Sequence, residues 1–128
     1  MVEAEKHSYR IKKPARFSRH PTPGYSARCR VWLEKDGELY VGGGRAALLE
    51  AIDKFGSIAA AARSMKLGYR NAWLWVQAMN RLAPSPLIEK GRGVEKGRYA
   101  VLTSEGRRAI EAFYQMNARC QQVLRDGI

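Results

Sequence analysis

The sequence predicts an α+β fold, and three observations predict it. Apolar residues repeat at helical spacing in four separate segments. Two pairs of strand-forming runs are each joined by a glycine-containing loop. One pair precedes these helical segments, and the other follows the third of them. Between Gly56 and Ala83, two short helical patterns are joined by a tight turn, as in a helix-turn-helix. The order is that of a winged helix-turn-helix: a β-hairpin, a three-helix core, a β-wing and a long C-terminal helix.

The chain divides into a tail and one domain. Residues 1–26 mix Pro, Gly and six Lys or Arg without a sustained period, so we expect an irregular, mobile basic tail. This tail either adds phosphate contacts or is inert, and both interpretations stay open. Residues 27–128 are about the length of one domain. No run approaches the ~20 apolar residues that span a bilayer, and the first residues lack a signal-peptide core, so we expect a cytoplasmic protein.

The domain is predicted to open with a β-hairpin. Charged and apolar residues alternate from Ala27, with Cys29, Val31 and Leu33 on one face. The pair Asp36-Gly37 tolerates the positive φ of a tight turn. A helix then runs roughly over residues 45–55, with Leu48, Ile52 and Phe55 inward and Gly56 at its end.

The helix-turn-helix pattern has two apolar stripes. Ser57 is the predicted N-cap of the first helix, whose stripe is Ile58, Ala61, Ala62 and Met65. Gly68 caps the second helix, whose stripe is Ala72, Trp73, Val76 and Met79. Trp73 is assigned to the core, and Asn80 is expected to tie down the loop that follows. Helical hairpins of this kind also occur in domains that do not bind DNA.

A glycine-rich loop joins the last two predicted strands. Pro84 and Pro86 prevent further helix, and strands follow on either side of G-R-G-V-E-K-G. The loop region carries four cations that can press against a phosphate backbone: Lys90, Arg92, Lys96 and Arg98. No nucleotide-binding glycine motif matches its spacing.

The final predicted helix begins at Thr103 or Ser104 and runs to about residue 125. One seam at coiled-coil spacing predicts a dimer interface, namely Ala109, Phe113, Met116, Cys120 and Val123. The same stripe also fits docking on the protein's own helices, and both can hold.

Charge and residue inventory narrow the function. The net charge is +11, of which residues 56–108 carry +7 and residues 1–26 carry +4, as a polyanion-binding face requires. His7 and His20 lack ligand partners at metal-binding spacing, so we expect neither metal nor cofactor. Cys29 and Cys120 are far apart and are interpreted as unpaired apolar fillers. No acid, base or nucleophile set indicates an enzyme.

Residues 27–124 closely resemble the N-terminal DNA-binding domain of the molybdate-responsive (ModE) transcriptional regulators, and more loosely the LysR-type winged helix. The resemblance lies in Gly56-Ser57-Ile58, Ala61-Ala62, Tyr69-Arg70, Ala72-Trp73, Met79-Asn80 and Val101-Leu102-Thr103. It implies a dimeric repressor or activator whose helix from Tyr69 enters the major groove. The family's molybdate site lies in a separate C-terminal β domain, so for a chain that ends at Ile128 we expect no molybdate binding. The loop G-R-G-V-E-K-G is more charged than the family's glycine run.

Six residues of the helix-turn-helix are candidate contacts with double-stranded DNA. Arg70 suits a guanine edge or a phosphate, and Asn71 suits adenine or a phosphate. Tyr69 and Ser57 can donate to backbone oxygens, and Leu74 and Gln77 are further candidates for base readout. RNA binding and a protein-interaction role remain the alternatives, although Trp32, Trp73 and Trp75 are spaced as packing residues and not as an RNA-stacking platform.

Overall fold

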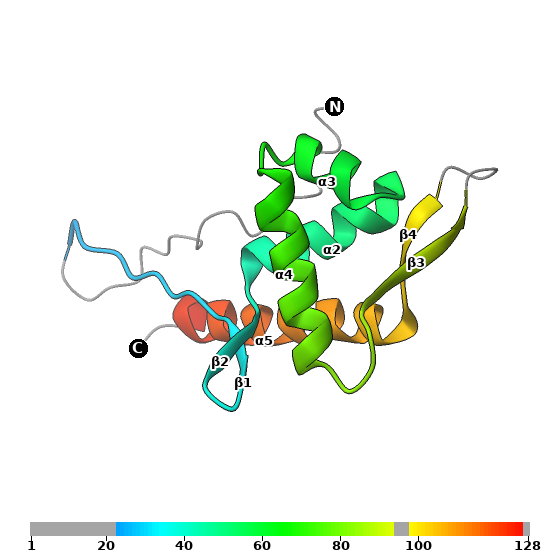
Figure 1. Cartoon of the computed structure of the whole chain (residues 1–128). Helices are drawn as coiled ribbons and strands as arrows, with labels where there is room; N and C mark the ends of the chain where they lie inside the picture. The colour runs from blue at the N-terminus through cyan, green and yellow to red at the C-terminus, as the bar shows by residue number, and fades with distance from the viewer. Residues whose placement is uncertain (1–22, 94–97, 127–128) are drawn as a thin grey trace.

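The computed structural model describes residues 23–93 and 98–126, and the predicted tail at 1–26 lies outside them except for residues 23–26 (Figure 1). The described part is an α+β domain with four helices and two antiparallel two-stranded sheets. The elements are β1 (Leu33–Lys35), β2 (Glu38–Val41), α2 (Gly43–Phe55), α3 (Ile58–Ser64), α4 (Tyr69–Leu82), β3 (Ile88–Gly93), β4 (Arg98–Leu102) and α5 (Ser104–Asp126). The predicted element order is therefore confirmed at the level of helices and strands.

Helix α2 is the centre of the domain. It contacts α3, α4, α5 and strands of both sheets, so its residues from Ala46 to Ile52 are all buried. Sequence spacing predicted one inward stripe, whereas the helix is covered on nearly every side. The helix begins at Gly43, two residues before the predicted start, and ends at Phe55; its C-cap is Gly56, whose φ of 81° is left-handed. A left-handed C-terminal residue is the usual position for glycine.

The first hairpin has the predicted turn but shorter strands. Asp36 and Gly37 have φ values of 51° and 83°, the pair of positive angles that a two-residue turn requires. Strand β1 begins only at Leu33, so Cys29 and Val31 lie in an extended segment before it and not in the predicted strand. We call residues 23–32 the arm; in Figure 1 it approaches β1 beside the C-terminal half of α5.

The second hairpin is fastened to the junction between α2 and α3. Strands β3 and β4 pair antiparallel, with Ile88 opposite Leu102. The backbone N–H groups of Tyr99 and Ala100 donate to the Gly56 carbonyl at 2.8 and 2.9 Å. These bonds hold β4 near its first residues, while the far end of β3 extends beyond the helices (Figure 1). Predicted site residue Lys96 lies outside the described part, as do the side chains of Arg92 and Arg98.

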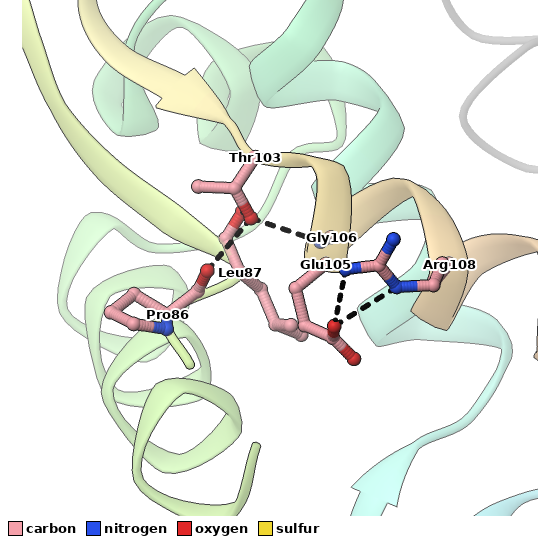
Figure 2. Close-up of polar contacts among 6 residues, drawn as sticks. All are labelled: Pro86, Leu87, Thr103, Glu105, Gly106 and Arg108. Atoms are coloured by element: carbon pink, nitrogen blue, oxygen red, sulfur yellow. Dashed lines mark hydrogen bonds and ion pairs between the residues drawn. The ribbon is translucent and has the colours of Figure 1, made fainter. Parts of the chain in front are cut away.

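Thr103 begins α5 and also binds the start of β3 (Figure 2). Its hydroxyl accepts from the Gly106 N–H at 3.0 Å, which makes it the N-cap, and donates to the Pro86 carbonyl at 2.7 Å. Its own N–H donates to the Leu87 carbonyl at 2.9 Å. Glu105, in the first turn, accepts from Arg108 at 2.8 Å. One residue therefore joins the long helix to the wing-like hairpin.

The face of α5 that docks on α2 includes part of the predicted dimer seam. Phe113 has no exposed surface and Ala109 is buried, because both lie in the protein's own core. Tyr114 donates to the Glu50 carboxylate at 2.7 Å and fastens α5 to α2. Within the described residues, no helix is long and apolar enough to cross a membrane.

Candidate nucleic-acid interface

Two short helices, α3 and α4, present the candidate surface. Ser57 is the N-cap of α3, as predicted, because its Oγ accepts from the Ala60 N–H at 3.0 Å. At the other end the Leu67 N–H donates to the Ala62 carbonyl at 2.9 Å, while Lys66 takes a left-handed φ of 56°. This is the bonding pattern of a Schellman turn, with a lysine where glycine is usual. The turn fixes the direction in which α4 leaves α3.

Helix α4 has a buried side and an outer side. Ala72, Val76 and Met79 are buried, and Trp75 joins them against the core. The opposite side carries Arg70, Trp73, Leu74 and Gln77 at i, i+3, i+4 and i+7, and all four are exposed. We call these four residues the outer face of α4.

The assignment of Trp73 to the core was wrong. Its side chain is 43% exposed, whereas Trp75 lies partly buried, and the Trp75 ring is 3.3 Å from where a Cβ on Gly44 would be. A stripe of 72, 75, 76 and 79 follows the helical repeat, while 73 lies three residues after Arg70 and shares the outer side. Spacing measured from Arg70 would have added Trp73 to the candidate contacts. Trp32 is exposed as well, so only Trp75 of the three tryptophans packs as predicted.

The cations near the outer face lack acidic partners. No Asp or Glu occurs between Asp53 and Glu89 in the sequence. Arg63, Lys66 and Arg70 are exposed, and within residues 23–93 and 98–126 none of them forms an ion pair. A polyanion would therefore not have to displace an acidic side chain of these ranges to reach them.

Some cations elsewhere on the domain are paired. Arg81 binds Glu38, and this hydrogen bond holds the pKa of the Glu38 carboxyl below its usual value. Arg107 binds Asp53 at 3.3 Å, which ties α5 to α2. Arg81 and Arg107 are thus neutralised locally, whereas Arg63, Lys66 and Arg70 form no ion pair within the described residues.

The other predicted contact residues that the structure describes lie at the start of α4 and on β3. Tyr69 is 56% exposed, and Asn71 is exposed in the same first turn of α4. Lys90 is exposed on β3, on the hairpin that follows α4. Gly68, the N-cap of α4, supplies no side-chain hydrogen bond to the first turn. Tyr69 and Asn71 thus flank the outer face on α4.

Asn80 positions the hairpin relative to α4. Its amide nitrogen donates to the Ile88 carbonyl at 3.0 Å, and its amide oxygen accepts from the Leu87 and Ile88 N–H groups at 2.8 and 3.2 Å. This confirms the prediction that Asn80 ties down the following loop. It also explains how a residue of the helix-turn-helix sets the direction of β3.

The structure divides the residues predicted for a dimer interface. Ala109 and Phe113 are covered by the protein's own core, so in this fold they offer no surface to a second chain. Met116 and Val123 are 46% and 63% exposed. Cys120 is partly buried against the arm, and its sulfur lies 2.8 Å from that of Cys29. The two cysteines were expected to be far apart, and the structure brings them together. Among the described residues, no cluster of three or more His, Cys, Asp or Glu has the arrangement of a metal site.

Comparison with known proteins gives relatives named as molybdenum-pterin-binding proteins and as ModE proteins. No protein-family model matches the chain. It is 42% identical over 103 residues to the molybdenum-pterin-binding protein MopB of Rhodobacter capsulatus, covering 79% of this chain and 38% of that protein. It is 36% identical over 95 residues to the molybdenum transport protein ModE of Azotobacter vinelandii, covering 74% and 35%.

A third relative carries a name that specifies DNA binding. The chain is 34% identical over 96 residues to the DNA-binding transcriptional dual regulator ModE of Escherichia coli, covering 75% of this chain and 36% of that protein. The chain spans little more than a third of the length of these curated relatives. It is therefore related in sequence to the ModE regulators and the molybdenum-pterin-binding Mop proteins over about three quarters of its own length.

Proposed function

We propose that this chain is a ModE-type winged helix-turn-helix domain that binds double-stranded DNA in a sequence-specific way and acts in transcriptional regulation. Helix α4 enters the major groove, α3 crosses the backbone above it, and the β3–β4 hairpin is the wing. The observation that carries the proposal is the outer face of α4, where Arg70, Trp73, Leu74 and Gln77 stand exposed on one side of a helix whose other side is packed. The names of the ModE relatives support it.

The side chains of the outer face suit base edges. Arg70 presents a planar fork of donors that matches the two acceptors of a guanine, and Gln77 and Asn71 suit the donor and acceptor of an adenine. Trp73 and Leu74 are apolar and exposed beside them, which suits the methyl group of thymine. These residues would supply discrimination between sequences.

Other residues suit the phosphate backbone. Tyr69, and the hydroxyl hydrogen of Ser57 that its capping role does not use, can donate to phosphate oxygens. Lys90, with Arg92, Lys96 and Arg98 further along the wing, would contact phosphates with little regard to sequence. Positive charge without acidic partners lowers the cost of this contact, and each phosphate neutralised releases counterions.

The proposed assembly is a homodimer through α5. Met116 and Val123 lie seven residues apart, on the same side of the helix, and are large exposed apolar groups. They replace Ala109 and Phe113 as the residues that would contact the second chain. A two-fold dimer of this kind would bind an inverted repeat.

The test measures binding to the tightest duplex selected from a randomised pool and to a random duplex. Affinity for both should fall steeply with salt, by about 10³ between 50 and 200 mM if six or more phosphates are contacted. Arg70→Ala should cost about 1–3 kcal/mol on the selected duplex and less on the random one.

A matched control separates readout from charge. Lys35→Ala removes the same charge from an exposed position on β1 and should leave the preference for the selected duplex unchanged. If Arg70→Ala weakened both duplexes equally, Arg70 would be a phosphate contact, and readout would rest on Asn71, Leu74 or Gln77. A salt-independent affinity, or stronger binding to a single-stranded or hairpin RNA of equal length, would contradict the proposed function.

A further inference from the structure

The arm and the last helix bring together two cysteines that are 91 positions apart in the sequence. The Cys120 thiol donates to the sulfur of Cys29, and the two sulfur atoms are 2.8 Å apart. A disulfide bond is about 2.05 Å long, so a shift of less than ~1 Å would join them. Both side chains are partly accessible, and both sulfurs are free thiols.

The contact between the arm and α5 is polar around this pair. Asn117 and Gln121 are buried on α5, one turn apart. Gln121 donates to the Cys29 carbonyl at 3.3 Å, a long hydrogen bond. The Gln121 side-chain oxygen is buried and, within the described residues, has no hydrogen-bond partner. Unsatisfied polar groups weaken such a contact, so noncovalent forces hold the arm less firmly than the core.

We infer that Cys29 and Cys120 form a reversible intramolecular disulfide, an oxidative modification site that locks the arm onto α5. The site is independent of the DNA-binding surface, since neither cysteine lies on α3, α4 or the wing. The oxidant is a peroxide. The disulfide would replace the weak polar contact between the arm and α5 by a covalent one.

The chemistry balances with one peroxide per disulfide. A thiolate of the pair attacks one peroxide oxygen, the O–O bond breaks, and the cysteine becomes a sulfenic acid as the first water molecule leaves. The second cysteine attacks that sulfur, the S–O bond breaks, and the second water leaves as the S–S bond forms. Two thiols lose two protons and two electrons, and hydrogen peroxide takes them up as two waters.

The environment of Cys29 disfavours its thiolate. Partial burial, the hydrogen bond with Cys120 and the charge of Cys120 together raise the pKa of Cys29 to about 11. Cys29 therefore stays protonated near neutral pH, so the oxidation should become faster as the pH rises.

The experiment uses the purified full chain, first reduced and then exposed to hydrogen peroxide. After alkylation with iodoacetamide in denaturant, the reduced chain should carry two added groups. The oxidised chain should carry no added group, and its mass should be about 2 Da, the mass of two hydrogens, below that of the reduced chain before alkylation. Dithiothreitol should restore both thiols. Chains cross-linked to one another, sulfinic acids without an internal bond, or an internal bond that dithiothreitol does not reduce would each overturn the inference.

Two further measurements test the lock itself. Trypsin should cut after exposed Arg28 and Arg30, which flank Cys29, about fivefold more slowly in the oxidised chain, because cleavage needs local opening. A disulfide that joins residues 91 positions apart closes a long loop, so it should raise the midpoint of thermal unfolding by about 5–20 °C. Cys29→Ser and Cys120→Ser are the controls, and peroxide should change neither quantity in them. Equal cleavage rates and midpoints for the oxidised and reduced wild-type chain would overturn the lock.

Discussion

Replacing Asn80 by Ala should destabilise the domain and loosen the wing-like hairpin. The change removes three hydrogen bonds, to the Leu87 N–H and to the N–H and carbonyl of Ile88. Leu87 has no exposed surface and Ile88 has 6%, so water does not readily replace the lost amide. At about 1 kcal/mol for each bond, the free energy of unfolding should fall by about 2–4 kcal/mol. For a domain of this size, the midpoint should drop by about 10–25 °C.

Asn80→Asp refines the same test. The carboxylate keeps an oxygen for the two N–H donors but turns a second oxygen, in place of the NH₂ group, toward the Ile88 carbonyl. One bond is lost and a repulsion replaces it, so the expected cost is about 1–2 kcal/mol. The control is Gln77→Ala, one turn earlier on the exposed side of α4, which should change stability by less than about 0.5 kcal/mol.

The measurement is urea unfolding followed by circular dichroism and tryptophan fluorescence. Both signals should give one transition, with the slope against urea unchanged in all three variants. Because the hairpin would also be less firmly placed, Asn80→Ala should weaken binding to selected and random DNA alike. A loss of stability below about 1 kcal/mol for Asn80→Ala would refute the reasoning, since it would mean that the three bonds are not made or are replaced by water.

Three other changes test the packing, the assembly and the ligand. Gly106→Ala should destabilise the fold by about 1–3 kcal/mol, since its Cβ would meet the Leu87 carbonyl oxygen at 2.5 Å; Gly68→Ser, in open space, should stay within about 0.5 kcal/mol in the same urea titration. Replacing Met116 and Val123 together by Glu should halve the mass seen in sedimentation without lowering thermal stability, and an unchanged mass would contradict a dimer through α5. Calorimetry with molybdate should give no stoichiometric heat, because exposed cations bind small oxyanions weakly in salt, and a micromolar affinity would contradict this expectation.

The arrangement of α3 and α4 could be predicted because its signals are local. Ser57 caps α3 through a group three residues away, and Asp36-Gly37 makes its turn within two residues. Asn80 was assigned to the following loop from its place near a helix end, and its partners lie seven and eight residues along the chain. Interactions over such short separations depend on few other parts of the fold, so a residue pattern is enough to indicate them.

The position of the tryptophans shows where a pattern becomes ambiguous. Residues 72, 76 and 79 define the buried side of α4, but both neighbours of Leu74 are tryptophans that border on it. Their environment was decided by α2, which brings Gly44 against Trp75 and leaves Trp73 in solvent. A sequence period shows which side of a helix is apolar to within about one residue per turn. The packing partner decides which of the residues at the border of that side are buried.

The sequence by itself determined the order of helices and hairpins, the caps, the turns and the concentration of positive charge without acids on α3 and α4. Only the tertiary structure decided which partner each apolar stripe has. It gave Ala109 and Phe113 to the protein's own core and left Met116 and Val123 exposed. It also brought Cys29 to Cys120 across 91 positions. Periodicity records that a face is apolar, whereas contact between distant segments depends on how all the helices pack together, and no local pattern carries that information.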